Sequence, residues 1–181
     1  MDDVATVVPG GELPAALCGL PVAAWADVPT AGAGWQALAP GELPDEPPFV
    51  VPPGLAAAAG VVIVEDDGRV WLVAPSNAFG GYSATFPKGR VDAGDSLHCA
   101  AIREAFEESG LQVRLVAFLT DARRTLTFTR YYVARRIGGT PAAMGWETQA
   151  VHLVPFARLR DVATHANDAG VIDALERWLA Q

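Results

Sequence analysis

Three glutamates that share one face of a helix constrain this chain more than any other feature. Residues 103–108 read Arg-Glu-Ala-Phe-Glu-Glu, and Gly110 follows at a position that favours the end of a helix. Carboxylates at positions i, i+3 and i+4, here Glu104, Glu107 and Glu108, lie within an arc of roughly 100°. Like charges this close weaken a helix unless a cation offsets them, and hard oxygen ligands suit Mg²⁺ or Mn²⁺. The segment therefore predicts a helix that binds a divalent cation.

The spacing of the residues around this helix resembles the signature of a known family. Counting from Gly89, Asp95 follows after five residues, and the segment 103–111 follows after seven more. This arrangement resembles the Nudix box, G-x5-E-x7-R-E-U-x-E-E-x-G-U, in which U is an aliphatic residue. Two positions depart from the pattern, because Asp95 is one methylene shorter than the glutamate of the family and Ala105 is small, although apolar. On this motif the chain is identified as a member of the Nudix family.

The resemblance implies an enzyme that hydrolyses a diphosphate linkage in a nucleoside diphosphate derivative, with Mg²⁺ or Mn²⁺ as cofactor. It implies four metal ligands, namely the side chains of Glu104, Glu107 and Glu108 and the carbonyl of Gly89. The metal would neutralise phosphate oxygens and polarise a water for attack on phosphorus. Glu104 is our choice for the base that deprotonates this water. Arg103, four positions before Glu107, would orient that carboxylate through an ion pair, so we expect catalysis to depend on Arg103, Glu104 and Glu107.

Further site candidates lie outside the helix. Lys88 and Arg90 flank Gly89 and would contact phosphates, or else stand as exposed loop charges. The scattered arginines Arg123, Arg124 and Arg130 are candidates to bind phosphate tails, but such arginines usually face solvent. Glu147 precedes a predicted strand, at about the point where several Nudix enzymes carry an extra carboxylate, and its alternative is an ordinary surface glutamate. Aromatic side chains are candidates to stack on a base, with packing in the core or at a sheet edge as their alternative. These candidates, of which Tyr131 is the one we assign to substrate binding, are Phe79, Tyr82, Tyr131, Tyr132 and Trp146.

Proline, glycine and alanine dominate residues 1–54, which contain ten of the 14 prolines. Such a segment cannot form long regular elements. It also carries Trp25 and Trp35, which free linkers rarely have, so we expect an irregular arm packed on the main domain, with a short helix near residues 15–20. We interpret residues 1–54 as this arm, covering a sheet edge or apolar surface, and residues 55–181 as the Nudix domain. A contribution of the arm to a dimer or to the substrate pocket is the alternative.

The rest of the chain predicts strands mixed with helices. Two apolar runs flank Asp66-Asp67-Gly68, which is a strong hairpin signal. The expected strands are 60–64, 70–73, 112–119, 126–137 and 148–154, and the expected helices are 96–109 and 168–180, capped by Asp95 or Ser96 and by Asn167. This order favours an α+β fold with helices packed on the faces of a sheet. The Nudix resemblance implies more specifically an α/β/α sandwich with a mixed β-sheet, over about residues 58–180.

Composition and charge narrow the range of partners. The 181 residues are 51% hydrophobic and carry a net charge of −8, with a pI near 4.7. Such acidity argues against nucleic acid and anionic membrane as partners, whereas a bound metal can still attract a small anionic nucleotide. Cys18 and Cys99 lie far apart and form no metal or redox motif. We expect a cytoplasmic protein with a small-molecule nucleotide substrate. A homodimer is compatible with the sequence.

Two classes of function remain for a chain of this kind. The first is a Mg²⁺-dependent Nudix hydrolase, and the second is a non-catalytic Nudix-fold module that binds a nucleotide. Because such modules usually lose a box glutamate and all three are present, the enzyme is favoured. The Phe-Pro-Lys-Gly stretch at 86–89 resembles that of hydrolases of dinucleoside polyphosphates, and the tyrosines at 131–132 lie a few residues away from the tyrosine that such enzymes often carry. We rank these substrates first, nucleoside triphosphates second and ADP-ribose third.

Overall fold

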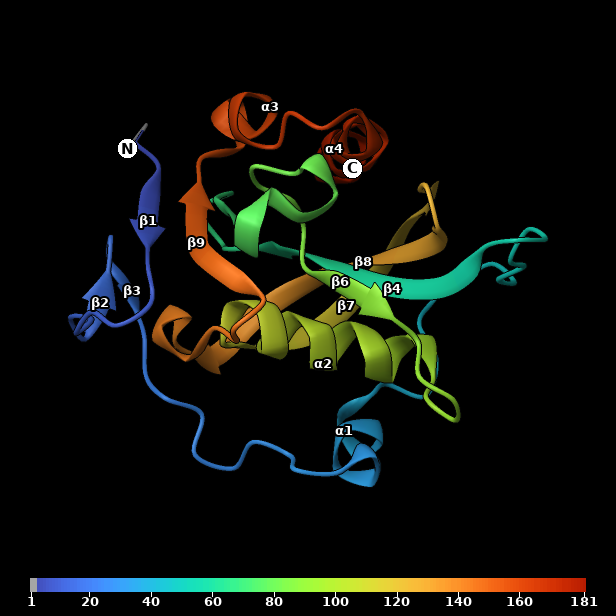
Figure 1. The fold of residues 1–181 in the computed structure, drawn as a ribbon, viewed down its shortest axis with the longest axis horizontal. Helices are drawn as coiled ribbons and strands as arrows, with labels where there is room; N and C mark the ends of the chain where they lie inside the picture. The colour runs from blue at the N-terminus through green and yellow to red at the C-terminus, as the bar shows by residue number, and fades with distance from the viewer. Residues whose placement is uncertain (1–2) are drawn as a thin grey trace.

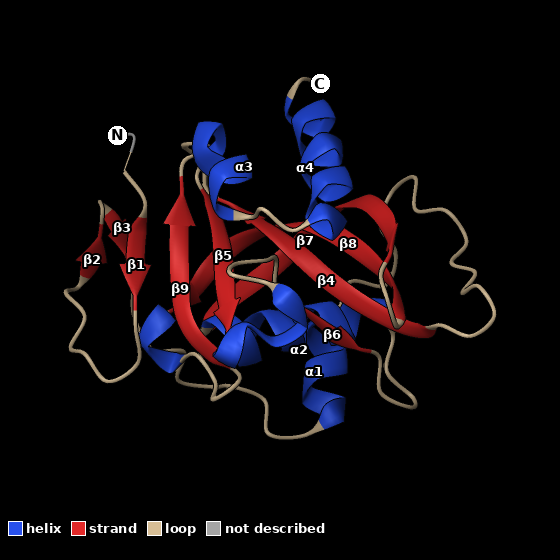
Figure 2. Ribbon diagram, turned by 45° about the horizontal axis from the view of Figure 1, so that its top comes forward, coloured by secondary structure: helices blue, strands red, loops and turns tan. Residues whose placement is uncertain are grey.

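A seven-stranded mixed sheet lies at the centre of the molecule, which is a computed structural model describing residues 3–181 (Figures 1 and 2). Its strand order is β1-β9-β5-β4-β8-β7, and β6 pairs with the first part of β4. Only the β4–β8 pair is parallel among the pairs of this sheet. The strands are β1 (Ala5–Val7), β4 (Ala56–Val64), β5 (Val70–Pro75), β6 (Lys88–Arg90), β7 (Leu111–Arg123), β8 (Thr127–Gly139) and β9 (Thr148–Val154).

Helices cover both faces of the sheet, and this confirms the predicted α/β/α sandwich. On one face lie α1 (Gly32–Leu38) and α2 (Leu97–Ser109), and on the other lie α3 (Leu159–Val162) and α4 (Ala166–Leu179). Strand β8 shows the expected alternation, because Tyr132 packs in the core beneath α2 and Tyr131 packs in the core beneath α4. Short 3₁₀ turns at 76–81, 141–143 and 156–158 complete the fold.

The ends of α2 follow the expected capping residues. The Ser96 side chain accepts a hydrogen bond of 3.1 Å from the Cys99 N–H, so Ser96, not Asp95, is the N-cap. Gly110 ends the helix with φ 72°, a left-handed conformation that favours glycine. The buried face of the helix includes Cys99 and Ile102, as predicted, while Phe106 is only half-buried.

Three local predictions are wrong. Residues 15–20 do not form a helix, because β2 (Ala16–Leu17) and β3 (Leu20–Pro21) pair as a small hairpin. The N-cap of α4 is His165, whose side chain accepts from the Asn167 N–H, so Asn167 is inside the helix. Scattered arginines were expected to face solvent, yet Arg124 and Arg130 are buried with acidic partners.

The arm of residues 1–54, as far as it is described, runs along the main domain. Its strand β1 pairs antiparallel with β9 and extends the sheet at one edge, and α1 lies against α2 (Figures 1 and 2). The boundary between arm and domain near residue 54 stays a prediction. In the part of the chain that the structure covers, no helix has the length and apolar character needed to cross a bilayer.

Candidate active site

The glutamates of α2 line a cavity of about 470 Å³. Its wall comes from two segments, the second half of α2 and the loop that precedes β9. The residues that line it are Glu104, Phe106, Glu107, Glu108, Ala143, Gly145, Trp146 and Glu147. The structure therefore brings together the three predicted metal-binding glutamates and the predicted extra carboxylate.

Two of these glutamates lie against the backbone that precedes the helix. A Cβ atom added to Gly89 would lie 2.0 Å from the Glu104 carboxyl carbon, so only glycine allows this approach. The neighbouring Lys88 N–H donates a 2.9 Å hydrogen bond to Glu108 Oε2. Strand β6 holds this stretch of backbone in place by pairing with β4. The predicted ligands Gly89, Glu104 and Glu108 thus belong to one compact region.

Arg103 is surrounded by carboxylates. Its Nη1 donates to Glu104 Oε1 and to Glu107 Oε2, each at 3.0 Å. Its Nη2 lies 3.1 Å from Asp92 Oδ2 and 3.6 Å from Asp95 Oδ2. The Glu107 contact is the i, i+4 pair that the sequence predicted, whereas Asp92 was missed, because an exposed aspartate in a loop gives no local signal of its partner.

The electrostatics of the cavity favour a bound cation. Burial raises the pKa of Glu104 to about 7, with Arg103 opposing the shift and the charges of Glu107 and Glu147 adding to it. Burial also raises the pKa of Glu108, against the influence of Lys88. Clustered carboxylates that resist ionisation are relieved when a divalent cation neutralises them. The site therefore has a physical reason to bind one.

The donor set fits Mg²⁺ or Mn²⁺ by its chemistry. Carboxylate oxygens and a backbone carbonyl are the hard ligands that these ions prefer, and the set contains neither thiol nor imidazole. Within residues 3–181 no three acidic, histidine or cysteine side chains already converge as a formed cation site. Arg103 engages both Glu104 and Glu107, so those carboxylates would have to turn toward a metal from their present pairs.

The loop before β9 places two more side chains at the cavity. The Gly145 N–H donates 2.8 Å to the Glu107 carbonyl, which ties this loop to the end of the helix. Ser76 ties it to the turn after β5, since its N–H donates to the Glu147 carbonyl at 2.7 Å and its hydroxyl to the Trp146 carbonyl at 2.9 Å. Trp146 is 86% exposed although it lines the cavity. A large apolar ring held in solvent beside an acidic site is a surface suited to a ligand.

The remaining predicted residues have different placements. Arg90 is exposed at the end of β6. Lys88 points into the molecule, where its ammonium lies 5.0 Å from the centre of the Tyr82 ring and burial lowers its pKa. Tyr131 is 0% exposed and its hydroxyl accepts from Arg124, so the structure does not present its ring to a nucleotide. Of the five aromatic candidates, Trp146 is the one among the residues that line the cavity.

Comparison with known proteins decides the family. The model of the NUDIX domain matches residues 54–178, which is more than half of the chain. The chain belongs to the Nudix family. Among solved structures, a NUDIX hydrolase from Nitrosomonas europaea superposes with a TM-score of 0.59 at 17% identity, covering 70% of this chain and 89% of that one. A Caenorhabditis elegans Ap4A hydrolase gives 0.57 at 20% identity, covering 70% and 98%. At these identities the likeness establishes the Nudix fold.

Nudix relatives with closer sequences are known as well. An RNA pyrophosphohydrolase from Cronobacter sakazakii is 34% identical over 118 residues, which covers 65% of this chain and 60% of that protein. The chain spans between 40% and 60% of the length of the curated relatives it matches. The Nudix domain model begins at residue 54, so the arm up to that point lies outside the matched region.

Proposed function

We propose that this protein is a Mg²⁺-dependent Nudix hydrolase that cleaves a diphosphate linkage in a nucleoside diphosphate derivative. The observation that carries the proposal is the cavity in which Glu104, Glu107, Glu108 and Glu147 meet beside the Gly89 backbone. A non-catalytic module would not need a carboxylate cluster in which burial raises the pKa of both Glu104 and Glu108. Mn²⁺ is the alternative metal, for the same ligand chemistry.

Each box residue has a proposed task. Glu104, Glu107, Glu108 and the Gly89 carbonyl would hold the metal, which supplies charge neutralisation at phosphate and an activated water. Arg103 holds Glu104 and Glu107 in place through its two ion pairs. Glu104 is also our choice for the base that accepts a proton from the attacking water. Glu147 adds negative charge at the rim and is exposed to solvent.

Dinucleoside polyphosphates are the preferred substrates in this proposal, with nucleoside triphosphates and ADP-ribose after them. The stacking surface is Trp146, since this exposed residue lines the cavity. The 5′ end of RNA is a second candidate, because the relatives with closer sequences are RNA pyrophosphohydrolases. A net charge of −8 weighs against long contacts with RNA phosphates. A cytoplasmic location and a homodimer stay predictions.

A panel of substrates with product identification tests this function. Dinucleoside polyphosphates, nucleoside triphosphates, ADP-ribose and a short 5′-triphosphorylated RNA would be incubated with Mg²⁺ and with a chelator. Hydrolysis in ¹⁸O water would show which phosphorus is attacked. Mg²⁺-dependent release of a nucleoside phosphate is expected, and no turnover of any of these compounds would contradict the proposal.

The contact to the base has its own test. Trp146→Ala should raise KM by roughly tenfold while kcat is largely kept, because stacking of one base on an aromatic ring is worth about 1–3 kcal/mol. Leu126→Ala serves as the control, since Leu126 is also exposed but lies in the turn between β7 and β8. An unchanged KM for every substrate in the panel would remove Trp146 from the substrate site.

A further inference from the structure

The arm touches α2, called the box helix because it carries the glutamates of the Nudix box, through a cluster of three aromatic rings. The Trp25 ring meets Phe106 edge-on with 5.3 Å between centroids, and Trp35 meets Phe106 at 5.9 Å. The two tryptophans also meet each other edge-on at 5.6 Å. Phe106 lies on α2 between Glu104 and Glu107 and lines the cavity with them. One side chain therefore contacts the arm and also forms part of the wall of the carboxylate site.

The arm also holds the first turns of the same helix. The Gln36 side-chain oxygen accepts a 3.3 Å hydrogen bond from the Ser96 N–H at the helix start. Two residues later the His98 ring contacts the arm at both nitrogens, with the Pro40 carbonyl at 3.0 Å and the Glu46 carboxylate at 2.7 Å. Helix α1, which contains Gln36, lies against the first part of α2 (Figure 1). The helix that carries the glutamates is thus fixed by the arm from its start to its middle.

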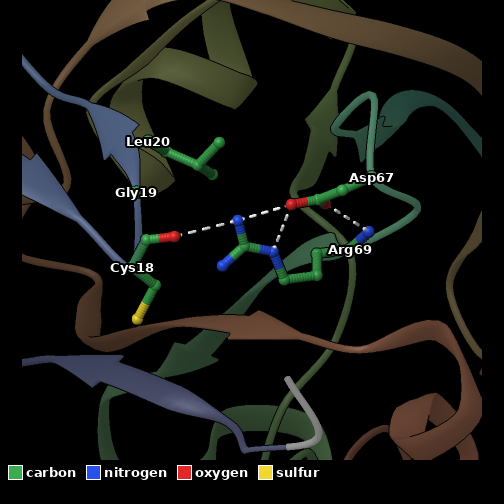
Figure 3. Close-up of a pocket in the computed structure, with 5 residues that line it drawn as sticks. All are labelled: Cys18, Gly19, Leu20, Asp67 and Arg69. Carbon is green, nitrogen blue, oxygen red and sulfur yellow. Dashed lines mark hydrogen bonds and ion pairs between the residues drawn. The ribbon is translucent and has the colours of Figure 1, made fainter.

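Other contacts of the arm lie away from the carboxylates. Arg69 donates a 3.1 Å hydrogen bond to the Cys18 carbonyl and is held by Asp67, beside a separate hollow of about 300 Å³ (Figure 3). Phe49 stacks on Phe128 of β8 with 5.4 Å between centroids. These contacts fasten the arm to the sheet and do not include a residue of α2. They provide natural controls for the contacts that do.

We infer that the arm is a positioning element for the catalytic helix, with Trp25 and Trp35 acting through Phe106 on the adjacent glutamates. The physical reason is the repulsion among Glu104, Glu107 and Glu108, which opposes a single fixed arrangement of that turn. Packing of Phe106 against two tryptophans restrains this turn of the helix and limits how far its carboxylates can part. The inference rests on the proposed function for its consequence in turnover, but its effect on metal binding is separate.

The test compares two full-length variants that each remove one aromatic ring of the arm. Trp25→Ala breaks the contact with Phe106, and Phe49→Ala breaks a contact with the sheet only. Binding of Mn²⁺ is measured by electron paramagnetic resonance, and kcat and KM are measured at a temperature where circular dichroism shows both variants folded. We expect Trp25→Ala to weaken Mn²⁺ binding roughly fivefold and to lower kcat with little change in KM. Phe49→Ala should lower the melting temperature and leave the Mn²⁺ affinity unchanged.

The outcomes separate this inference from the proposed function. Unchanged Mn²⁺ binding in Trp25→Ala, or equal losses in both variants, would overturn the inference. Trp25→Phe should restore most of the affinity, and Trp25→Leu, which keeps apolar volume, replaces the alanine variant if that one does not fold. The wild-type protein could turn over none of the nucleotides while Trp25→Ala still weakens Mn²⁺ binding. That result would contradict the proposed function and support the positioning role of the arm.

Discussion

Helix α2 lines the cavity directly, whereas the arm contacts the cavity-lining Phe106 from outside the set of lining residues. In α2 the groups that matter come from little more than one turn of regular structure, Glu104 to Glu108, so their spacing is fixed by the helix itself. In the arm, Trp25, Trp35 and Glu46 stand at irregular intervals. Both tryptophans contact Phe106, and Glu46 contacts His98. The regular geometry of α2 therefore sets the spacing of the carboxylates, and long-range contacts with the arm restrain the helix that carries them.

This difference predicts which measurements respond to a change in each region. Substitutions among the helix glutamates remove charge from a site where charges repel, so they should impair turnover without loss of stability. Substitutions in the arm remove partners from buried groups, so they should lower the free energy of unfolding, and those that remove a contact with Phe106 should also affect the metal site. The predictions below test whether the two regions separate in this way.

The largest expected effect is on turnover in the box helix. Glu107→Gln and Glu108→Gln should each slow hydrolysis by roughly 10²-fold or more at saturating Mg²⁺, which corresponds to about 2.7 kcal/mol of transition-state stabilisation. Their melting temperatures should stay equal to or above that of the wild type, because a repelling charge is removed. The measurements are kcat and a thermal melt of each variant.

Glu176→Gln provides the matched control for these two variants. Glu176 is also a helical glutamate, but it lies exposed on α4 and pairs with Arg160. It should leave kcat unchanged. Normal activity in both Glu107→Gln and Glu108→Gln would show that the carboxylates do not serve as metal ligands.

A smaller effect, on stability, is expected from Glu46 in the arm. Its carboxylate accepts from the Tyr132 hydroxyl at 2.7 Å and from Arg130 Nη1 at 3.1 Å, besides its contact with His98. Glu46→Gln should cost on the order of 2 kcal/mol of unfolding free energy, since it leaves a buried arginine with one charged partner fewer. Chemical denaturation would measure this loss, with the exposed Glu42→Gln as the control. A loss no larger than that of the control would show that the arm is loosely held here.

The pH dependence of this loss follows from the pKa of Glu46. Burial would raise this pKa, but hydrogen bonds from Tyr132 and His98 outweigh burial and lower it from its ordinary value of 4.5. A lowered pKa means that the stabilisation is complete above pH 4.5 and is lost as the pH falls through the folded-state value. The gap in stability between wild type and Glu46→Gln should therefore narrow in acid. A gap that widens below pH 4.5 would contradict this account.

The two regions also differ in how well their structure could be predicted from the sequence. The spacing of Glu104, Glu107 and Glu108 predicted one helix face, and the Asp-Gly turn at 67–68 predicted the β4–β5 hairpin, because both signals are local. The partners of Glu46 lie 52 to 86 residues away in sequence, at His98, Arg130 and Tyr132, and no periodicity links such positions. The contacts of Glu46 therefore could not be predicted from the sequence.

Burial of charge was the other feature that local patterns did not reveal. Arg124 in the turn after β7 forms an ion pair with Asp168, which is 0% exposed and 44 residues later. Arginine in a turn is usually solvated, so its pattern indicated the surface. Tyr131 failed as a stacking candidate for a related reason, since the alternation of β8 placed it on a face but not its hydroxyl beside Arg124. Tertiary pairing, and not propensity, decided each of these positions.

A still smaller effect is expected at Asp95, which contacts Arg103 of α2 and lies near Gly32 of the arm. Its Oδ2 is 3.6 Å from Arg103 Nη2, and its Oδ1 is 3.9 Å from the place where a Cβ of Gly32 in the arm would stand. Ser96 caps the helix, so Asp95→Asn removes a charge without removing the cap. Arg103 keeps three other carboxylates.

Asp95→Asn should therefore retain most activity, within roughly threefold of wild-type kcat, and cost at most about 1 kcal/mol of stability. Kinetics and a denaturation curve on this variant, with Asp92→Asn beside it, provide the measurement. Asp92 is closer to Arg103, at 3.1 Å, but its side chain is 71% exposed, so solvent screens its pair and its loss should be smaller still. A drop in kcat as large as that of Glu107→Gln would instead assign Asp95 a direct part in catalysis, and the shorter side chain at this box position would then have to be accommodated by the metal site itself.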